Sequence, residues 1–180
     1  MGEPGVAWRY AGVPLSEEET RSRCAALIAC RDPVELAPHI ATTGEISRDT
    51  AYETIPARFF YEANGERLPD AFPDDQALVL HTGSGIVLVL GCAHAGVVNT
   101  MRHVARVTGA DSFRAVLGGM HLGGASEERM AKTIEAFRDF RVERIGAAHC
   151  TGEAATQAFG DAFEGWCFGC SAGTVLEFPR

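Results

Sequence analysis

Three histidines recur at nearly equal intervals in the second half of the chain. His94, His121 and His149 are separated by 27 and 28 residues, and each lies in a turn of small residues that contains glycine. Imidazole nitrogens are good ligands for zinc, iron and copper. A lone histidine is more often a surface residue, so the repeated setting is what predicts a shared metal site for these side chains.

The interval also predicts where the three histidines lie. A strand, a turn and a helix together take about 30 residues, so each histidine marks one strand–turn–helix unit. Helices are expected after the turns, ending near Thr108 and Phe163, with the middle helix capped by Ser126. The carboxyl ends of neighbouring strands, about 4.8 Å apart, form the edge where open α/β sheets bind ligands. The strands expected to carry the histidines cover residues 86–90, 113–117 and 142–148.

The rest of the chain is less regular and is expected to belong to the same single, partial domain. Residues 1–15 form an arm, residues 16–73 a helix and loop-rich insert, and residues 74–180 the strand–histidine–helix repeats. A capping box that begins at Ser16 predicts a helix to about Cys30. Further strands, one of them forming a hairpin with residues 86–90, are expected at 34–36, 39–41, 76–81 and 174–178.

The remaining histidines do not share the setting of the first three. We expect His39 to lie in a loop, His81 at a hairpin turn and His103 on the solvated face of a helix. None of them is therefore predicted to bind a metal.

The six cysteines are predicted to be reduced thiols, since the N-terminus has neither the basic nor the apolar segment of a secretion signal. Cys167 and Cys170 have CxxC spacing, which alone is a weak sign of metal binding or redox chemistry. A redox role would need a thiol of low pKa, and no basic neighbour is seen to supply it. We expect the pair to be small, partly buried residues.

The composition excludes several classes of partner. The 180 residues carry a net charge of −8, which argues against nucleic acid or an anionic membrane surface as the main partner. No apolar run approaches the roughly 20 residues of a membrane-spanning helix. We therefore expect a cytoplasmic protein with a small-molecule substrate, which can be phosphorylated because a phosphate needs only a local cluster of donors.

Several motifs occur in an order that is typical of one protein family. They are TGEISR at 43–48, DDQAL at 74–78, GCAHAGVVNT at 91–100, GGMHL at 118–122 and HCTG at 149–152. From about residue 40 to 165 the chain resembles the 7,8-dihydropterin-6-yl-methyl-4-(β-D-ribofuranosyl)aminobenzene 5′-phosphate synthases, a branch of the metallo-β-lactamase-fold hydrolases. The family pattern GCSHAG is matched except that Ala93 replaces the serine.

The resemblance implies an αββα sandwich with a metal centre, usually of two ions, at one edge of the sheets. His94 resembles the histidine that completes the first metal site, and His149 resembles the late histidine of the second. His121 lies where the superfamily often has a bridging acid, which makes it a candidate ligand or substrate contact. The metal is expected to be zinc, with iron or manganese as alternatives.

Four further residues are candidates for substrate binding, while no catalytic residue is assigned. Two are acids that follow Pro73, where they also suit a turn, and the other two follow His149 directly. The candidates are Asp74, Asp75, Cys150 and Thr151.

The superfamily's main metal motif, HxHxDH, does not occur in this sequence. We therefore expect the chain to be the C-terminal two-thirds of such an enzyme and to be inactive alone. A misplaced start codon, a truncated gene or a natural split into two chains would each account for this. The predicted function is that of a metal-dependent hydrolase or transferase for a small, phosphorylated, pterin-like metabolite. The alternative is a non-catalytic remnant or half-module that binds metal or a partner chain. Its partner would be the missing N-terminal half or a second copy of the chain.

Overall fold

The structure is a computed structural model, and the residues that it describes are 9–10, 12–56 and 58–179. The chain divides into two compact units, Met1–Cys30 and Arg31–Arg180. The predicted arm over residues 1–15 lies mostly outside the described residues, and its described part contains no helix or strand.

The first unit contains the helix α1 (Glu17–Arg23), and this helix begins at the predicted capping box. The Ser16 hydroxyl accepts a hydrogen bond from the Glu19 N–H at 3.2 Å, and the Glu19 carboxylate accepts one from the Ser16 N–H at 2.9 Å. The predicted end near Cys30 is wrong, because the helix ends at Arg23. None of the residues of α1 is buried, so no packing extends a helix that is marginal by itself.

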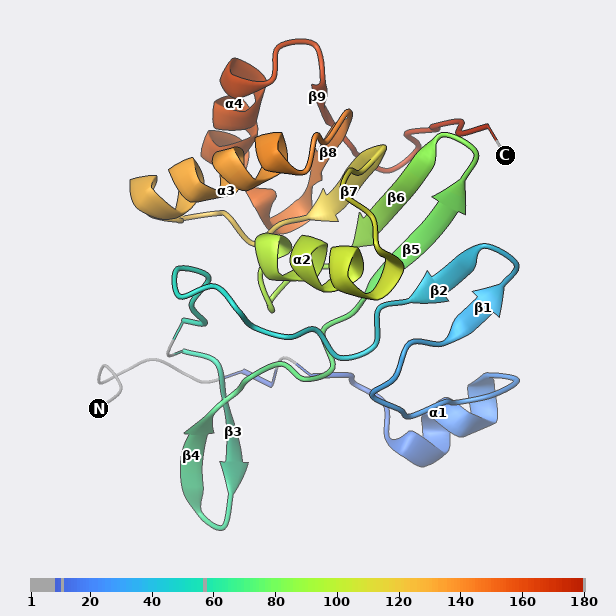
Figure 1. Ribbon diagram of the computed structural model, residues 1–180. Coiled ribbons are helices and arrows are strands. Elements are labelled where there is room, and N and C mark those ends of the chain that lie inside the picture. Colours follow the sequence, from blue (N-terminus) through green and yellow to red (C-terminus); the bar gives the residue numbers. More distant parts are fainter. Residues whose placement is uncertain (1–8, 11, 57, 180) are drawn as a thin grey trace. The chain divides into compact units, whose positions relative to one another are not determined.

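The second unit is built on a mixed seven-stranded sheet with the strand order β1-β2-β5-β6-β7-β8-β9 (Figure 1). In this order, the neighbours among β1, β2, β5 and β6 pair antiparallel, whereas the neighbours among β6, β7, β8 and β9 pair in parallel. The parallel half brings the carboxyl ends of its strands to one edge, as the spacing of the histidines predicts. The strands are β1 (Glu35–Ala37), β2 (Ile40–Thr42), β5 (Ala77–Thr82), β6 (Gly85–Leu90), β7 (Ala115–Gly119), β8 (Ile145–Ala148) and β9 (Cys167–Gly169).

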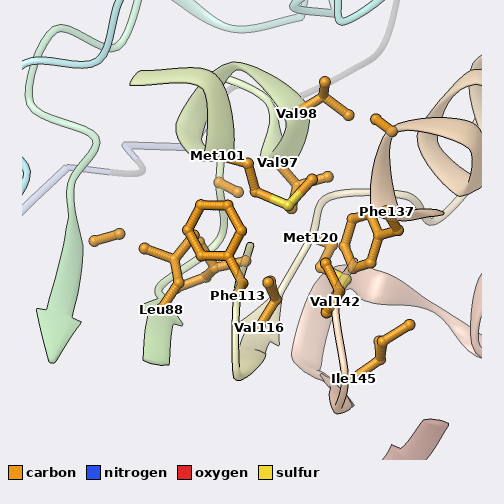
Figure 2. Packing of buried hydrophobic residues seen from close by; sticks show 14 of the residues in the cluster. Leu88, Val97, Val98, Met101, Phe113, Val116, Met120, Phe137, Val142 and Ile145 are labelled. Carbon is orange, nitrogen blue, oxygen red and sulfur yellow. The ribbon is translucent and has the colours of Figure 1, made fainter. Parts of the chain in front are cut away.

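Three helices follow the parallel strands and pack on the same face of the sheet (Figure 1). Their apolar sides meet alternate strand residues, such as Leu88 and Val116, in the main hydrophobic core (Figure 2). Met101, Phe113 and Phe137 are fully buried there. No helix among the described residues is long and apolar enough to cross a membrane. The helices are α2 (Val97–Thr108), α3 (Glu127–Asp139) and α4 (Glu153–Ala162), with the short 3-10 helix η1 (His149–Thr151) after β8.

The opposite face of the sheet carries a second, smaller apolar cluster. Val87 and Leu117 are buried on this side, and the C-terminal segment adds Leu176 and Phe178. This segment packs across the face and forms no strand, so the strand predicted at 174–178 is wrong. The sheet ends instead with β9, which pairs in parallel with β8. The described residues thus form one sheet and one helical layer of the predicted αββα arrangement.

A further hairpin lies in the stretch that was expected to be rich in loops. It consists of β3 (Phe60–Ala63) and β4 (Glu66–Pro69), which pair antiparallel. Asn64 and Gly65 join the strands with left-handed backbone at both residues. An Asn-Gly pair is the turn signal of a two-residue hairpin, so the sequence contained the information for this element.

His103 lies on a buried side of α2, so the prediction of a solvated histidine is wrong. It is 8% exposed, and its Nε2 atom donates a hydrogen bond to the Thr43 carbonyl at 3.1 Å. Because Thr43 is distant in sequence, the helical pattern alone could not show that this side of the helix is covered. His39 is exposed in the turn between β1 and β2, as expected, whereas His81 is exposed on β5, next to the hairpin turn at which it was expected.

Replacing Phe137 by alanine should lower the free energy of unfolding by about 3–5 kcal/mol, because the ring is fully buried. Its centroid lies 4.9 Å from that of Phe159, so the variant also loses an aromatic contact. Denaturation in urea measures the change. The matched control is Val107→Ala on α2, where the side chain is 53% exposed and the loss should stay within about 0.5 kcal/mol. Equal losses in the two variants would contradict this packing.

Candidate metal centre

The parallel strands β6, β7 and β8 end in tight turns at one edge of the sheet. In each turn one residue other than glycine has left-handed backbone: Ala93 with φ 51°, His121 with φ 48° and His149 with φ 47°. Such conformations are uncommon for residues with a Cβ atom and gather at functional sites. They turn the chain sharply, so that each predicted histidine stands directly beyond its strand.

His94 and His121 lie against each other at this edge. Their ring centroids are 4.7 Å apart, and the rings are nearly perpendicular. Burial, together with the nearby His94, Arg129 and Arg58, lowers the pKa of His121 to about 4. The His121 ring is therefore neutral at pH 7, and its buried Nδ1 atom has no hydrogen-bond partner within the described part of the chain. A neutral imidazole nitrogen is the form that binds a metal ion.

Two phenylalanines border this pair of histidines. The ring centroid of Phe72 lies 4.3 Å from that of His94, and the centroid of Phe59 lies 5.6 Å from that of His94 and 6.1 Å from that of His121. The Arg58 guanidinium lies over the Phe59 ring at 5.1 Å. This edge combines an aromatic wall, a positive charge and two imidazoles, which suits a flat, anionic small molecule.

His149 lies in a different group, together with two thiols. Its Nδ1 atom is 3.3 Å from the Cys92 Sγ atom. The ligand atoms of Cys92, His149 and Cys150 all lie within 4.8 Å of one another. Burial, followed by the neighbouring Cys150, raises the pKa of Cys92 to about 11. Cys92 is therefore a neutral thiol at pH 7 when no cation is near.

The donors at this edge fit a divalent metal ion, although the three predicted histidines do not form one close set. Among the described residues, the group of at least three potential ligands within 4.8 Å of one another is that of Cys92, His149 and Cys150. His94 pairs with His121 instead. An unpartnered imidazole nitrogen and two thiols are the nitrogen and sulfur donors that zinc prefers.

Two polar side chains hold the turn that carries His94. Arg48 donates a hydrogen bond to the His94 carbonyl at 2.9 Å, and the Asp75 carboxylate accepts one from the Ala95 N–H at 2.7 Å. Burial raises the pKa of Asp75, while the hydrogen bond from Ala95 and the nearby His94 oppose this shift. The peptide group between His94 and Ala95 is thus held from both its carbonyl and its N–H without any use of the His94 ring.

A buried carboxylate caps the helix that follows this turn. Glu53, which is 2% exposed, accepts hydrogen bonds from the N–H groups of Val98 and Asn99 at 2.9 and 2.7 Å. The helix α2 has no side-chain cap of its own, because its N-cap residue is Gly96. A Cβ atom at Gly96 would collide with the Glu53 carboxylate, so the glycine makes room for this cap. The negative charge also suits the positive end of the helix dipole.

The residues predicted to bind substrate lie in different surroundings. Asp75 and Cys150 lie at the edge with the histidines and thiols. Asp74 is exposed in the loop before β5. Thr151 is buried, and its hydroxyl accepts a hydrogen bond from one backbone group and donates to another at the end of β7. Its role is therefore to tie η1 to β7.

The CxxC pair does not belong to this site. Cys167 lies in β9, and burial raises the pKa of its thiol. Cys167 and Cys170 are both partly buried, as expected.

Several residues at the site were not predicted from the sequence. Cys92 could have been identified, because it lies in the same motif as His94, just as Cys150 lies in the same motif as His149. Arg48 belongs to the TGEISR stretch, but nothing in that stretch shows which backbone group it binds. The remaining residues come from irregular chain without periodicity: Glu53, Arg58, Phe59 and Phe72.

Two curated proteins are similar to this chain. The 7,8-dihydropterin-6-methyl-4-(beta-D-ribofuranosyl)-aminobenzene-5'-phosphate synthase of Methanocaldococcus jannaschii is 33% identical over 154 residues, which cover 84% of this chain and 52% of that protein. The uncharacterized protein MJ0448 of the same organism is 29% identical over 146 residues, which cover 80% of this chain and 52% of that protein. The chain thus spans about half the length of the curated relatives it matches. No family model matches it.

A solved structure has the same arrangement of helices and strands. It is the crystal structure of Tm1679, described as a metal-dependent hydrolase of the beta-lactamase superfamily. The match has a TM-score of 0.80 and 32% sequence identity, and it covers 91% of this chain and 62% of that chain.

Replacing Glu53 by glutamine should lower the free energy of unfolding by about 1–3 kcal/mol, because an amide N–H₂ cannot accept the hydrogen bonds of the α2 N-terminus. Urea denaturation measures the loss, and Glu66→Gln on the exposed strand β4 is the matched control. A Glu53 variant as stable as this control would show that the buried carboxylate does not hold the helix.

Proposed function

We propose that this chain, which has the metallo-β-lactamase fold predicted from its sequence, supplies part of the active site of a metal-dependent hydrolase or transferase for a small, phosphorylated, pterin-like metabolite, and is inactive without the rest of that site. The observation that carries the proposal is the neutral, unpartnered Nδ1 atom of His121 beside His94, at the edge where the parallel strands end. The relatives support the same chemistry, since one is named as a pterin-related synthase and another is described as a metal-dependent hydrolase.

The residues that would hold metal at this edge are the adjacent pair His94 and His121 and, in the group with the two thiols, His149. Zinc suits these donors best. A divalent ion bound there supplies Lewis-acid polarisation of a phosphoryl or carbonyl oxygen and lowers the pKa of a water molecule. The residues of this chain orient the imidazoles that would bind the ion. Burial keeps His121 neutral, while Arg48 and Asp75 hold the backbone of the turn around His94.

The surroundings of the histidines support a substrate with a flat ring and a phosphate. The rings of Phe59 and Phe72 form a wall on which a pterin ring can stack. Arg58 and Arg129 lie close enough to His121 to lower its pKa, and the buried Nε atom of Arg129 has no hydrogen-bond partner among the described residues. A guanidinium with a free donor suits a phosphate oxygen.

His94→Ala and His149→Ala should each weaken metal binding by at least about 10-fold, because each variant removes an imidazole donor. Elemental analysis of the purified chain measures the metal content after equilibration with zinc, iron or manganese. His39→Ala and His81→Ala are the matched controls, since both histidines are exposed and away from the site. Unchanged metal content in both site variants would refute the assignment. In the completed enzyme, His121→Ala should lower turnover.

Phe72→Leu should weaken the binding of a reduced pterin phosphate by about 2- to 10-fold, the equivalent of about 0.5–1.5 kcal/mol of aromatic contact. Fluorescence titration of the pterin measures the dissociation constant. Phe168→Leu is the matched control, because this ring packs on the opposite face of the sheet. The same affinity in both variants would exclude the phenylalanine wall as a ring-binding surface.

A further inference from the structure

We infer that Cys92, His149 and Cys150 form a zinc site in which two thiolates and one imidazole nitrogen hold the ion. The residues come from the turns after β6 and β8, which are separated in the sheet by β7. Their side chains nevertheless converge, because the three ligand atoms lie within 4.8 Å of one another. The inference rests on the proposed function only in that both use His149 as a metal ligand. The two thiolate ligands are not part of the proposed function.

The distances between the donors are close to those of a tetrahedral zinc site. With zinc–sulfur bonds of about 2.3 Å and a zinc–nitrogen bond of about 2.0 Å, the sulfur-to-nitrogen distance is about 3.5 Å and the sulfur-to-sulfur distance about 3.8 Å. The Cys92 Sγ atom lies 3.3 Å from the His149 Nδ1 atom. Adjustments of less than about 1 Å, within the range of rotamer changes, would therefore complete the geometry.

Gly119 allows the two thiols to meet over the end of β7. A Cβ atom at this position would lie 2.8 Å from the Cys150 Sγ atom, 3.3 Å from the Cys92 Cα atom and 2.5 Å from the Gly91 carbonyl oxygen. The missing side chain thus leaves the space in which Cys92 and Cys150 approach each other. A residue larger than glycine would separate the turns that carry them.

The donor set also determines which metal the site accepts. Thiolates are soft ligands that favour zinc over manganese or magnesium. On binding, each of the two thiols gives up its proton to solvent, and the sulfur lone pairs form the bonds to the ion. A cavity of about 400 Å³ borders His149 and is also lined by Gly152, Glu153 and Thr156. Neither cysteine lines this cavity, so it borders the proposed site on the side of His149.

Protection of the thiols from alkylation tests the site in the unaltered chain. Zinc should slow the reaction of Cys92 and Cys150 with iodoacetamide by at least about 10-fold, as measured by mass spectrometry of the labelled peptides. Cys24 is exposed and should react at the same rate with or without zinc. Manganese should protect neither thiol. Unchanged rates for Cys92 and Cys150 at saturating zinc would overturn the inference.

Variants provide a second test with cobalt as the probe. The wild-type chain should show a thiolate-to-cobalt charge-transfer band, which Cys92→Ser, Cys150→Ser and Gly119→Ala should each lose. Cys170→Ser and Gly160→Ala are the matched controls, since the methyl added at Gly160 meets no atom within 4 Å. Circular dichroism identifies any variant that fails to fold, and for such a variant the alkylation result decides. A band that persists in both cysteine variants would contradict the inference.

The two proposals fail in different ways. If His94→Ala abolishes zinc retention while zinc leaves Cys92 and Cys150 reactive, the thiolate site is refuted and the histidine centre stands. If zinc protects both thiols and His94→Ala retains the ion without loss, the thiolate site stands and the proposed histidine centre is refuted.

Discussion

The close approach of three strands at the carboxyl end of β7 is the constraint on which the site depends. A Cβ atom at Gly118, where φ is 119°, would collide with the Leu90 carbonyl of β6. The next residue, Gly119, donates its N–H to the Gly91 carbonyl at 3.0 Å, and the Thr151 hydroxyl links η1 to the same strand end. Because this junction has no side chains of its own, the turns after β6, β7 and β8 can present their histidines and cysteines to a common space.

A buried polar network then keeps the first of these turns rigid. Glu53 caps α2 from a distant segment, and Arg48 and Asp75 bind the carbonyl and the N–H of the peptide group between His94 and Ala95. All of these interactions use backbone atoms of the turn or of the first residues of α2, so the His94 ring is left for a ligand. Preorganisation of this kind stabilises a binding site because little conformational entropy is lost when the ligand arrives.

The sequence predicted the parts of the fold that depend on local pattern. The interval between His94, His121 and His149 correctly implied repeated strands, turns and helices, because each unit has its own apolar period. It could not show that His121 pairs with His94 while His149 meets Cys92, since these contacts depend on the left-handed backbone of the turns. Contacts between residues far apart in the sequence could not be predicted either, because they depend on how distant segments pack. The burial of His103 and the aromatic wall of Phe59 and Phe72 are examples.

The central claim is that the carboxyl edge of the parallel strands binds a metal through nitrogen and sulfur atoms of its own turns. Zinc K-edge X-ray absorption of the chain loaded with one equivalent of zinc tests it most directly. The account predicts sulfur neighbours at about 2.3 Å together with nitrogen at about 2.0 Å. Coordination by oxygen atoms alone, or zinc that is removed by simple buffer exchange, would contradict it.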